Sequence, residues 1–217
     1  GSLSTSTNAT STDTSNLAEL QSTYLTPNIK EVALSAKKDK MFYMIQSDSG
    51  TVGTISNVDG TKGVSIFNSP VREWNASWPK ADTLALTTKA SAKIPGYMYF
   101  VNTTTGKTQR VLGGILGLTT LTNPTASTTI YNQNDADGNT YLSMFNIKTG
   151  VPNQITSTTF TEKCVWSKKN AGLLYCAVPT TIAKGDYPDK WYKGLVSFSD
   201  SIWKIDTTTG KTDLLVN

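Results

Sequence analysis

The sequence predicts an all-β protein built as a tandem array of small antiparallel sheets. Segments of about five to seven residues rich in Thr, Val, Ile, Tyr and Phe alternate with Gly, Asp, Asn and Pro, the pattern of strands separated by turns. A similar segment returns about every 44 residues, and such a period is typical of stacked structural repeats. No long 3.6-residue periodicity follows residue 30, so helices are not expected in the body of the chain.

Two landmarks define the repeat. The first is a short turn before an apolar strand, and its equivalent positions are Ala36, Pro79, Asn123 and Ser167. The second is a turn whose glycine supplies the positive φ that a hairpin requires, and these glycines are Gly60, Gly106, Gly150 and Gly210. Each repeat then holds two strands before a middle connection and two after it. Because one such unit cannot bury its own faces, we expect a β-propeller-like array of four four-stranded antiparallel blades.

Three parts are expected along the chain. Residues 1–16 are rich in Ser, Thr and Asn and predict a flexible linker that opens with a tag-like Gly-Ser pair. Residues 17–30 predict one short capped helix and a lead-in. Residues 31–217 predict the propeller-like domain, and its repeats are expected at 31–70, 71–114, 115–157 and 158–217. Most rings contain about six to eight blades, so a fragment of a larger propeller, an open arc and a compact ring all stay open.

The turns carry a family resemblance. Ser-Lys-Lys-Asn after Trp166, and its partners in the other repeats, resemble the Trp-Ser-Pro-Asp-Gly turn of TolB-like and WD-type β-propeller repeats. Within this turn, only Pro124 keeps the proline of the family pattern, and no repeat keeps its final glycine. The stretches 78–89, 162–179 and 187–206 are similar to uncharacterised envelope-associated propellers of bacteria with reduced genomes. This resemblance implies an extracytoplasmic place at the bacterial cell surface or envelope, a membrane anchor upstream and further blades, but no activity.

Composition excludes several chemistries. The chain has no histidine, which removes Ser-His-Asp and Cys-His nucleophiles and His-based metal sites. The net charge of +4 comes from scattered lysines, with Arg72 and Arg110 the only arginines, so a nucleic-acid groove is not expected. A sialidase-type propeller needs a third arginine, and the glutamates are scattered. We therefore expect no catalytic residue and no cofactor.

The middle connections indicate the functional face. In a four-stranded blade they share one face with the connections between blades, and length variation there marks function. They are expected at 47–51, 89–96, 134–139 and 179–200, and the last is the longest. It combines aromatic and charged residues, the composition of binding hot spots. The residues expected to bind a protein partner are Lys89, Lys93, Asp186, Tyr187, Asp189, Trp191, Tyr192 and Lys193.

Other interpretations of the long connection stay open. Trp191 and Tyr192 equally fit a satellite core that holds the loop in place. A carbohydrate-binding or carbohydrate-processing propeller would use Tyr187, Trp191 and Tyr192 as sugar platforms, with Asp186, Asp189 or Asp200 as an acid; two carboxylates beside the rings would distinguish it. A purely structural role, in which the chain caps a larger propeller, would show an exposed apolar blade at either end.

Two smaller features complete the sequence analysis. Cys164 and Cys176 lie on consecutive strands, and a five-residue turn would place them opposite each other. A cross-strand disulfide in an oxidising compartment and a pair of small core residues are equally good interpretations. Asp135, Asp137 and Asn139 resemble the start of a calcium loop. That loop lacks the bidentate glutamate at its twelfth position, so no metal site is expected.

Overall fold

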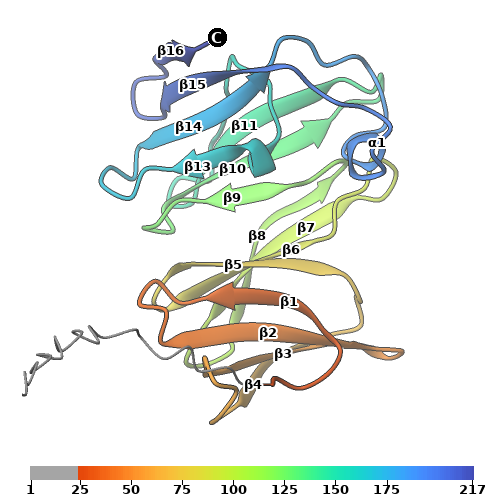
Figure 1. Cartoon of the computed structure of the whole chain (residues 1–217), viewed down its shortest axis with the longest axis vertical. Coiled ribbons are helices and arrows are strands. Elements are labelled where there is room, and N and C mark those ends of the chain that lie inside the picture. Colours follow the sequence, from red (N-terminus) through yellow and green to blue (C-terminus); the bar gives the residue numbers. More distant parts are fainter. Residues whose placement is uncertain (1–23) are drawn as a thin grey trace, which may run out of the picture.

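The computed structural model describes residues 24–217 and contains four four-stranded antiparallel sheets (Figure 1). In every sheet the strands are hydrogen bonded in chain order. The predicted all-β class and the array of four-stranded blades are therefore confirmed. The helix expected within residues 17–30 falls largely on residues outside the described part of the chain, and residues 24–28 form coil and turn.

The strands have the following bounds. Sheet 1 contains β1 (Ile29–Leu34), β2 (Lys40–Ser47), β3 (Gly50–Asn57) and β4 (Val64–Ser69). Sheet 2 contains β5 (Trp74–Lys80), β6 (Thr83–Thr88), β7 (Gly96–Asn102) and β8 (Thr108–Ile115). Sheet 3 contains β9 (Thr120–Thr122), β10 (Thr128–Asn134), β11 (Thr140–Asn146) and β12 (Pro152–Gln154). Sheet 4 contains β13 (Cys164–Trp166), β14 (Leu173–Pro179), β15 (Asp200–Asp206) and β16 (Thr212–Val216). A 3-10 turn η1 (Thr161–Lys163) precedes β13, and a short helix α1 (Asp189–Tyr192) lies in the long connection of sheet 4.

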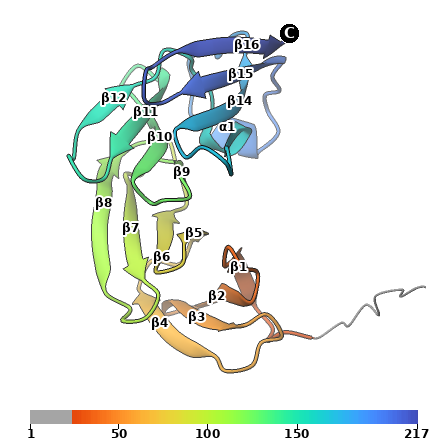
Figure 2. The same ribbon diagram turned by 90° about the vertical axis from the view of Figure 1, so that its left-hand side faces the viewer.

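The sheets follow one another along an open arc, with sheets 1 and 4 at its two ends (Figure 2). The first strand of each sheet lies on the concave inner side, and the fourth lies on the outside (Figure 2). The middle connections of sheets 2 and 4 meet on one side of the arc, where α1 lies (Figure 1). This arrangement brings segments about 100 residues apart in the sequence into one neighbourhood.

Apolar side chains fill each interface between neighbouring sheets. Successive side chains of a strand point to opposite faces, so one strand can contribute side chains to the interfaces with both neighbouring sheets. On β10, Ile130 packs in the cluster shared with sheet 4, and Tyr131 packs in the cluster shared with sheet 2. Phe42 and Leu84 are fully buried between sheets 1 and 2. Burying one such side chain contributes about 1.5–3 kcal/mol.

Polar contacts reinforce these interfaces. The indole Nε1 of Trp166 donates a hydrogen bond to the carbonyl of Leu121, at 3.1 Å, and so fastens sheet 4 to sheet 3. On the inner side, the Glu31 carboxylate accepts the backbone N–H of Ala76 at 2.9 Å, which joins β1 to β5. Burial raises the pKa of Glu31, against the lowering effect of that hydrogen bond.

The repeated glycine turns have the expected geometry. Gly106, between β7 and β8, has a φ of 68°. The side chain of Asn102 accepts the backbone N–H groups of Thr104 and Thr105 in the same turn. Asn146 and Asp206 cap the equivalent turns of sheets 3 and 4 in the same way. An Asn or Asp at the start of the turn is thus as regular a mark of the repeat as the glycine.

Both ends of the arc present apolar side chains to solvent. On sheet 1, Ala33 is buried towards sheet 2, and its neighbours Val32 and Leu34 are exposed. On sheet 4, Val165 and Ile202 are exposed. This is the feature that a capping role in a larger propeller would require. Among residues 24–217, no helix has the length and hydropathy needed to cross a bilayer.

Candidate binding surface of the long connection

The long connection between β14 and β15 is fastened to the connections of two other sheets. Asp186 forms an ion pair with Lys93, with 2.8 Å between carboxylate oxygen and Nζ. Asp189 accepts the backbone N–H of Ala92 at 2.6 Å. Tyr187 accepts, through its carbonyl, a hydrogen bond from the side chain of Asn134 at 2.5 Å. Loops 89–96 and 179–200, which the sequence assigned to one face, therefore lie in direct contact.

An aromatic cluster forms the underside of this connection. It consists of Phe160, Tyr187, Trp191 and Phe198. The rings of Phe160 and Trp191 are stacked with centroids 4.9 Å apart, and Phe160 and Tyr187 are buried. Of the two residues in the satellite-core interpretation, Trp191 packs inward together with Tyr187, whereas Tyr192 is 46% exposed. Offset aromatic pairs of this kind contribute about 0.5–1.5 kcal/mol beyond their buried area.

An ion pair lies against the same cluster. Lys163 Nζ is 2.6 Å from each carboxylate oxygen of Asp200, and the side chains are 11% and 22% exposed. The ammonium group also lies 4.7 Å from the ring centroid of Phe198. Asp200, considered from the sequence as an acid for sugar chemistry, is thus held by a lysine that itself lies over an aromatic ring.

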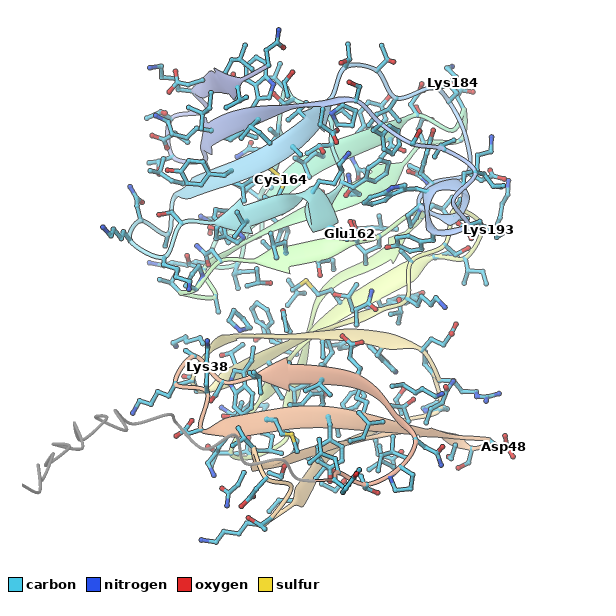
Figure 3. The ribbon with its side chains drawn as sticks, viewed as in Figure 1. Lys38, Asp48, Glu162, Cys164, Lys184 and Lys193 are labelled. Carbon is cyan, nitrogen blue, oxygen red and sulfur yellow. A yellow bond between two sulfur atoms is a disulfide. The ribbon has the colours of Figure 1, made fainter. Side chains whose placement is uncertain are left out.

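Tyr192 lies at the edge of the aromatic cluster, with its ring centroid 6.1 Å from that of Trp191. Its hydroxyl donates a hydrogen bond to the carboxylate of Glu162 in η1. Burial raises the pKa of Tyr192, and the charge of Glu162 together with the hydrogen bond to it raises that pKa further. Both side chains line a pocket of about 430 Å³ on the inner side of the arc. In Figure 3, Glu162 lies near the middle of the molecule, whereas Lys193 lies at its edge beside α1 and Lys184 lies further along the same edge.

The lysines of the surface differ in their partners. Lys89 pairs with Glu73 of its own sheet at 2.9 Å and not with the long connection. Lys93 pairs with Asp186, whose pKa is lowered first by that contact and then by the charges of Lys190 and Lys193. Three ammonium groups thus surround one carboxylate. The edge of the surface is positively charged as a result.

The sequence pattern indicated the loop and four of its anchoring residues, Lys93, Asp186, Tyr187 and Asp189, but as partner-binding residues. Phe160 and Phe198 were missed because each is an isolated apolar residue among Thr or Ser. Glu162 and Lys163 were missed because neither belongs to a local motif. Nothing in the Thr-rich sequence around Glu162 and Lys163 indicated that η1 would face the long connection.

The two cysteines are bonded in the structure. Cys164 and Cys176 are direct partners on β13 and β14, and a disulfide joins them. Cys164 follows η1 immediately and also lines the inner pocket. The disulfide therefore holds the inner strand of sheet 4 beside Glu162.

The loop that resembles a calcium site is closed by hydrogen bonds to Asp135. Its carboxylate accepts the backbone N–H groups of Asp137 and Asn139, both at 2.9 Å. It also accepts the side-chain amide of Asn139 and the hydroxyl of Tyr141. These donors, with Asn139 the first, lower the pKa of Asp135 to about 2. In the part of the chain that the structure describes, no three His, Cys, Asp or Glu residues are grouped to hold a metal ion.

Consecutive four-stranded sheets that pack face to face along an arc define a β-propeller-type protein. No protein-family model and no curated protein matches the sequence. Among solved structures, TolB from Acinetobacter baumannii is similar, with a TM-score of 0.58 and 13% identity over 86% of this chain and 42% of that one. An uncharacterised protein from Listeria monocytogenes gives 0.60 and 14% identity over 90% of this chain and 56% of that one. An oligogalacturonate lyase from Vibrio parahaemolyticus gives 0.59 and 8% identity over 88% and 55%.

The chain spans about half the length of these solved structures. At such identities the similarity concerns the fold alone. The TolB-like propeller fold expected from the Trp-containing turns is thus found in the structural neighbours, and propellers host many unrelated functions.

Proposed function

We propose that this chain is a non-catalytic binding module of the bacterial cell envelope, and that it engages a protein partner through the loop surface formed by residues 89–96 and 179–200. The observation that carries the proposal is the anchoring of the long connection to sheets 2 and 3 through Lys93, Ala92 and Asn134. A loop ordered before binding avoids part of the entropy that association costs.

The outer side of the loop surface has the character of a protein interface. Ile94 and Leu195 are each 69% exposed. Exposed Lys184 and Lys193 stand at its edge. Apolar side chains surrounded by charge are typical of interfaces with a buried centre and a polar rim. The positive edge favours a partner with an acidic rim.

One observation supports an extracytoplasmic location. The disulfide between Cys164 and Cys176 is a bond that persists in oxidising compartments and is rare in the bacterial cytosol. The envelope location and the protein partner are parts of the same proposal, because a partner would have to meet this surface outside the cytoplasm.

Site-specific photo-crosslinking tests the proposal. A photoreactive amino acid placed at Leu195 or Ile94 is expected to capture the same single protein from envelopes of the source organism. Val151 and Val64 are exposed to a similar degree but lie away from the loops, so the same group at either position serves as the control. Capture from all four positions, or from neither loop position, would contradict the proposal.

A carbohydrate-binding or carbohydrate-processing role is the alternative. It is favoured by one observation, the pairing of Tyr192 with Glu162 beside the inner pocket. The similar fold of an oligogalacturonate lyase adds nothing about this chain's substrate. Tyr187 and Trp191, the other rings expected as sugar platforms, belong to the aromatic cluster. If this chain binds a carbohydrate, the pocket and not the exposed loop would therefore hold it.

A further inference from the structure

The inner pocket of about 430 Å³ lies between sheets 2, 3 and 4, within the range of about 300–1,000 Å³ typical of small-molecule sites. Sheets 1 and 2 are joined along their inner strands by Glu31 and Ala76. Between sheets 2 and 3 the inner strand β9 is only 3 residues long. The inner end of that interface is consequently open, although its outer part is filled by apolar side chains.

Strand alternation turns polar side chains into this opening. On β5, Trp74 and Trp78 face the core shared with sheet 1, so Asn75 and Ser77 between them point to the opposite face. Thr87 is the register partner of Asn75 on β6 and shares that face. The opposite wall comes from sheet 3 and η1. The polar residues that line the pocket are Asn75, Ser77, Thr87, Thr119, Thr120, Thr161, Glu162 and Tyr192.

Hydrogen bonds hold these hydroxyl groups in place. The hydroxyls of Thr87 and Thr120 are 2.6 Å apart, across sheets 2 and 3. Thr161 donates to the hydroxyl of Thr119 at 2.7 Å, and Thr119 donates to the side chain of Asn132 at 2.8 Å. Each hydroxyl offers one donor and two acceptor positions, so these contacts fix the side chains and leave acceptor positions for a ligand. The wall is rigid before anything binds.

The charge of the lining selects the class of ligand. Glu162 is the single charged residue that lines the pocket, and no lysine or arginine does. An anion would meet a carboxylate without a compensating cation. Tyr192 covers one side with an aromatic ring whose hydroxyl is fixed on Glu162. A ring, a carboxylate acceptor and several fixed hydroxyls together suit a ligand with apolar C–H faces and many hydroxyl groups.

We propose that this pocket is a second binding site, which shares Tyr192 with the loop surface but is otherwise lined by residues of sheets 2, 3 and 4, and that it takes a short neutral saccharide. One sugar face packs on the ring of Tyr192, as amphipathic aromatic side chains permit. Sugar hydroxyls donate to Glu162 and exchange hydrogen bonds with Thr87 and Thr120. Glu162 orients the ligand and transfers no proton, so the site binds and does not cleave.

Saturation-transfer NMR and calorimetry with defined probes test this proposal. Maltose, cellobiose and N,N′-diacetylchitobiose are the neutral probes, digalacturonate is the anionic probe and spermidine is the cationic probe. At least one neutral disaccharide is expected to bind at millimolar concentration, and digalacturonate is not. Thr120→Val, which keeps the side-chain shape, and Glu162→Gln are each expected to weaken binding about tenfold, or about 1.4 kcal/mol.

The controls make the result decisive. Lys193→Ala, on the exposed edge of the loop surface, is expected to leave saccharide binding unchanged, and circular dichroism shows whether each variant is folded. Absence of binding by every neutral probe overturns the proposal, as does binding that Thr120→Val leaves unchanged. Binding of spermidine alone would replace the saccharide with a cationic ligand and overturn it too. Photo-crosslinking from Leu195 is independent of these outcomes, so the two proposals fail separately.

Discussion

Lys163 places its ammonium nitrogen 2.6 Å from both carboxylate oxygens of Asp200. The lysine immediately precedes β13 and the aspartate begins β15, so the pair joins the inner strand of sheet 4 to the end of the long connection. Little of either side chain reaches solvent. This pair and the aromatic cluster together hold the segment that joins α1 to β15 against sheet 4.

Removing one partner of this pair should destabilise the protein more than removing both. Lys163→Met leaves the Asp200 carboxylate without its cation, and we expect a loss of about 2–4 kcal/mol in the free energy of unfolding. Lys163→Met combined with Asp200→Leu should recover part of that loss because no uncompensated charge stays behind. Urea unfolding of the wild type, both single variants and the double variant measures the coupling. A coupling energy of zero would show that the pair is screened like a surface ion pair.

Loss of the aromatic cluster should free the long connection while the sheets persist. Phe160→Ala removes the ring that contacts Tyr187, Trp191 and Phe198, at a cost of about 3–5 kcal/mol. Trypsin should then cleave at the lysines of residues 184–193 much faster under native conditions. Leu195→Ala, an exposed change in the same loop, is the matched control and should cleave at the wild-type rate. Equal protection in Phe160→Ala would mean that the hydrogen bonds to sheets 2 and 3 suffice.

The disulfide should contribute measurably to stability. It closes a segment with a sequence separation of 12, and cross-links of this size contribute about 2–4 kcal/mol, chiefly through the unfolded chain. The double variant Cys164→Ala, Cys176→Ala should therefore unfold at lower urea concentration than the oxidised wild type. Reductant should lower the urea midpoint of the wild type to a similar value and leave the midpoint of the variant unchanged. Two titratable thiols in the non-reduced, unfolded wild type would contradict the bond itself.

Asp135 should make stability depend on pH in the acid range. Its pKa falls from 3.8 to about 2 in the folded chain. The carboxylate therefore stabilises the fold above about pH 4, and this contribution is lost as the pH falls towards 2. Asp135→Asn should melt at a lower temperature than the wild type at pH 6, and the difference should shrink at pH 2. Asp137→Asn is the control because Asp137 contributes its backbone N–H to the turn; the same pH dependence in that variant would exclude Asp135 as its source.

Local patterns made the array predictable. Each repeat is marked by a turn, an alternating strand and a glycine whose φ has to be positive. The glycines expected in the hairpin turns, Gly60, Gly106, Gly150 and Gly210, all have a positive φ. The position of the long connection was also predictable, because an insertion stands out against three shorter equivalents.

The interior of the candidate site was not predictable in the same way. Asp189 reaches the backbone of Ala92 across 97 residues, and Tyr192 reaches Glu162 across 30. Sequence analysis treated Trp191 and Tyr192 as one unit, since adjacent aromatics in a loop have the same composition whichever way they point. The four-residue helix α1 (Asp189–Tyr192) places Trp191 within the aromatic cluster and Tyr192 at its edge, where it also lines the pocket. Only the three-dimensional path of the chain determines that division.

The bridging contacts of the long connection also bear on how the protein comes apart. In a linear array each unit touches only its neighbours, so unfolding begins at whichever end is held by a single interface. Sheet 4 is held by its interface with sheet 3 and, through Asp186 and Asp189, by the connection of sheet 2. These ties couple sheets 2 to 4 into one cooperative unit, and sheet 1 is left as the end where local opening requires the least free energy.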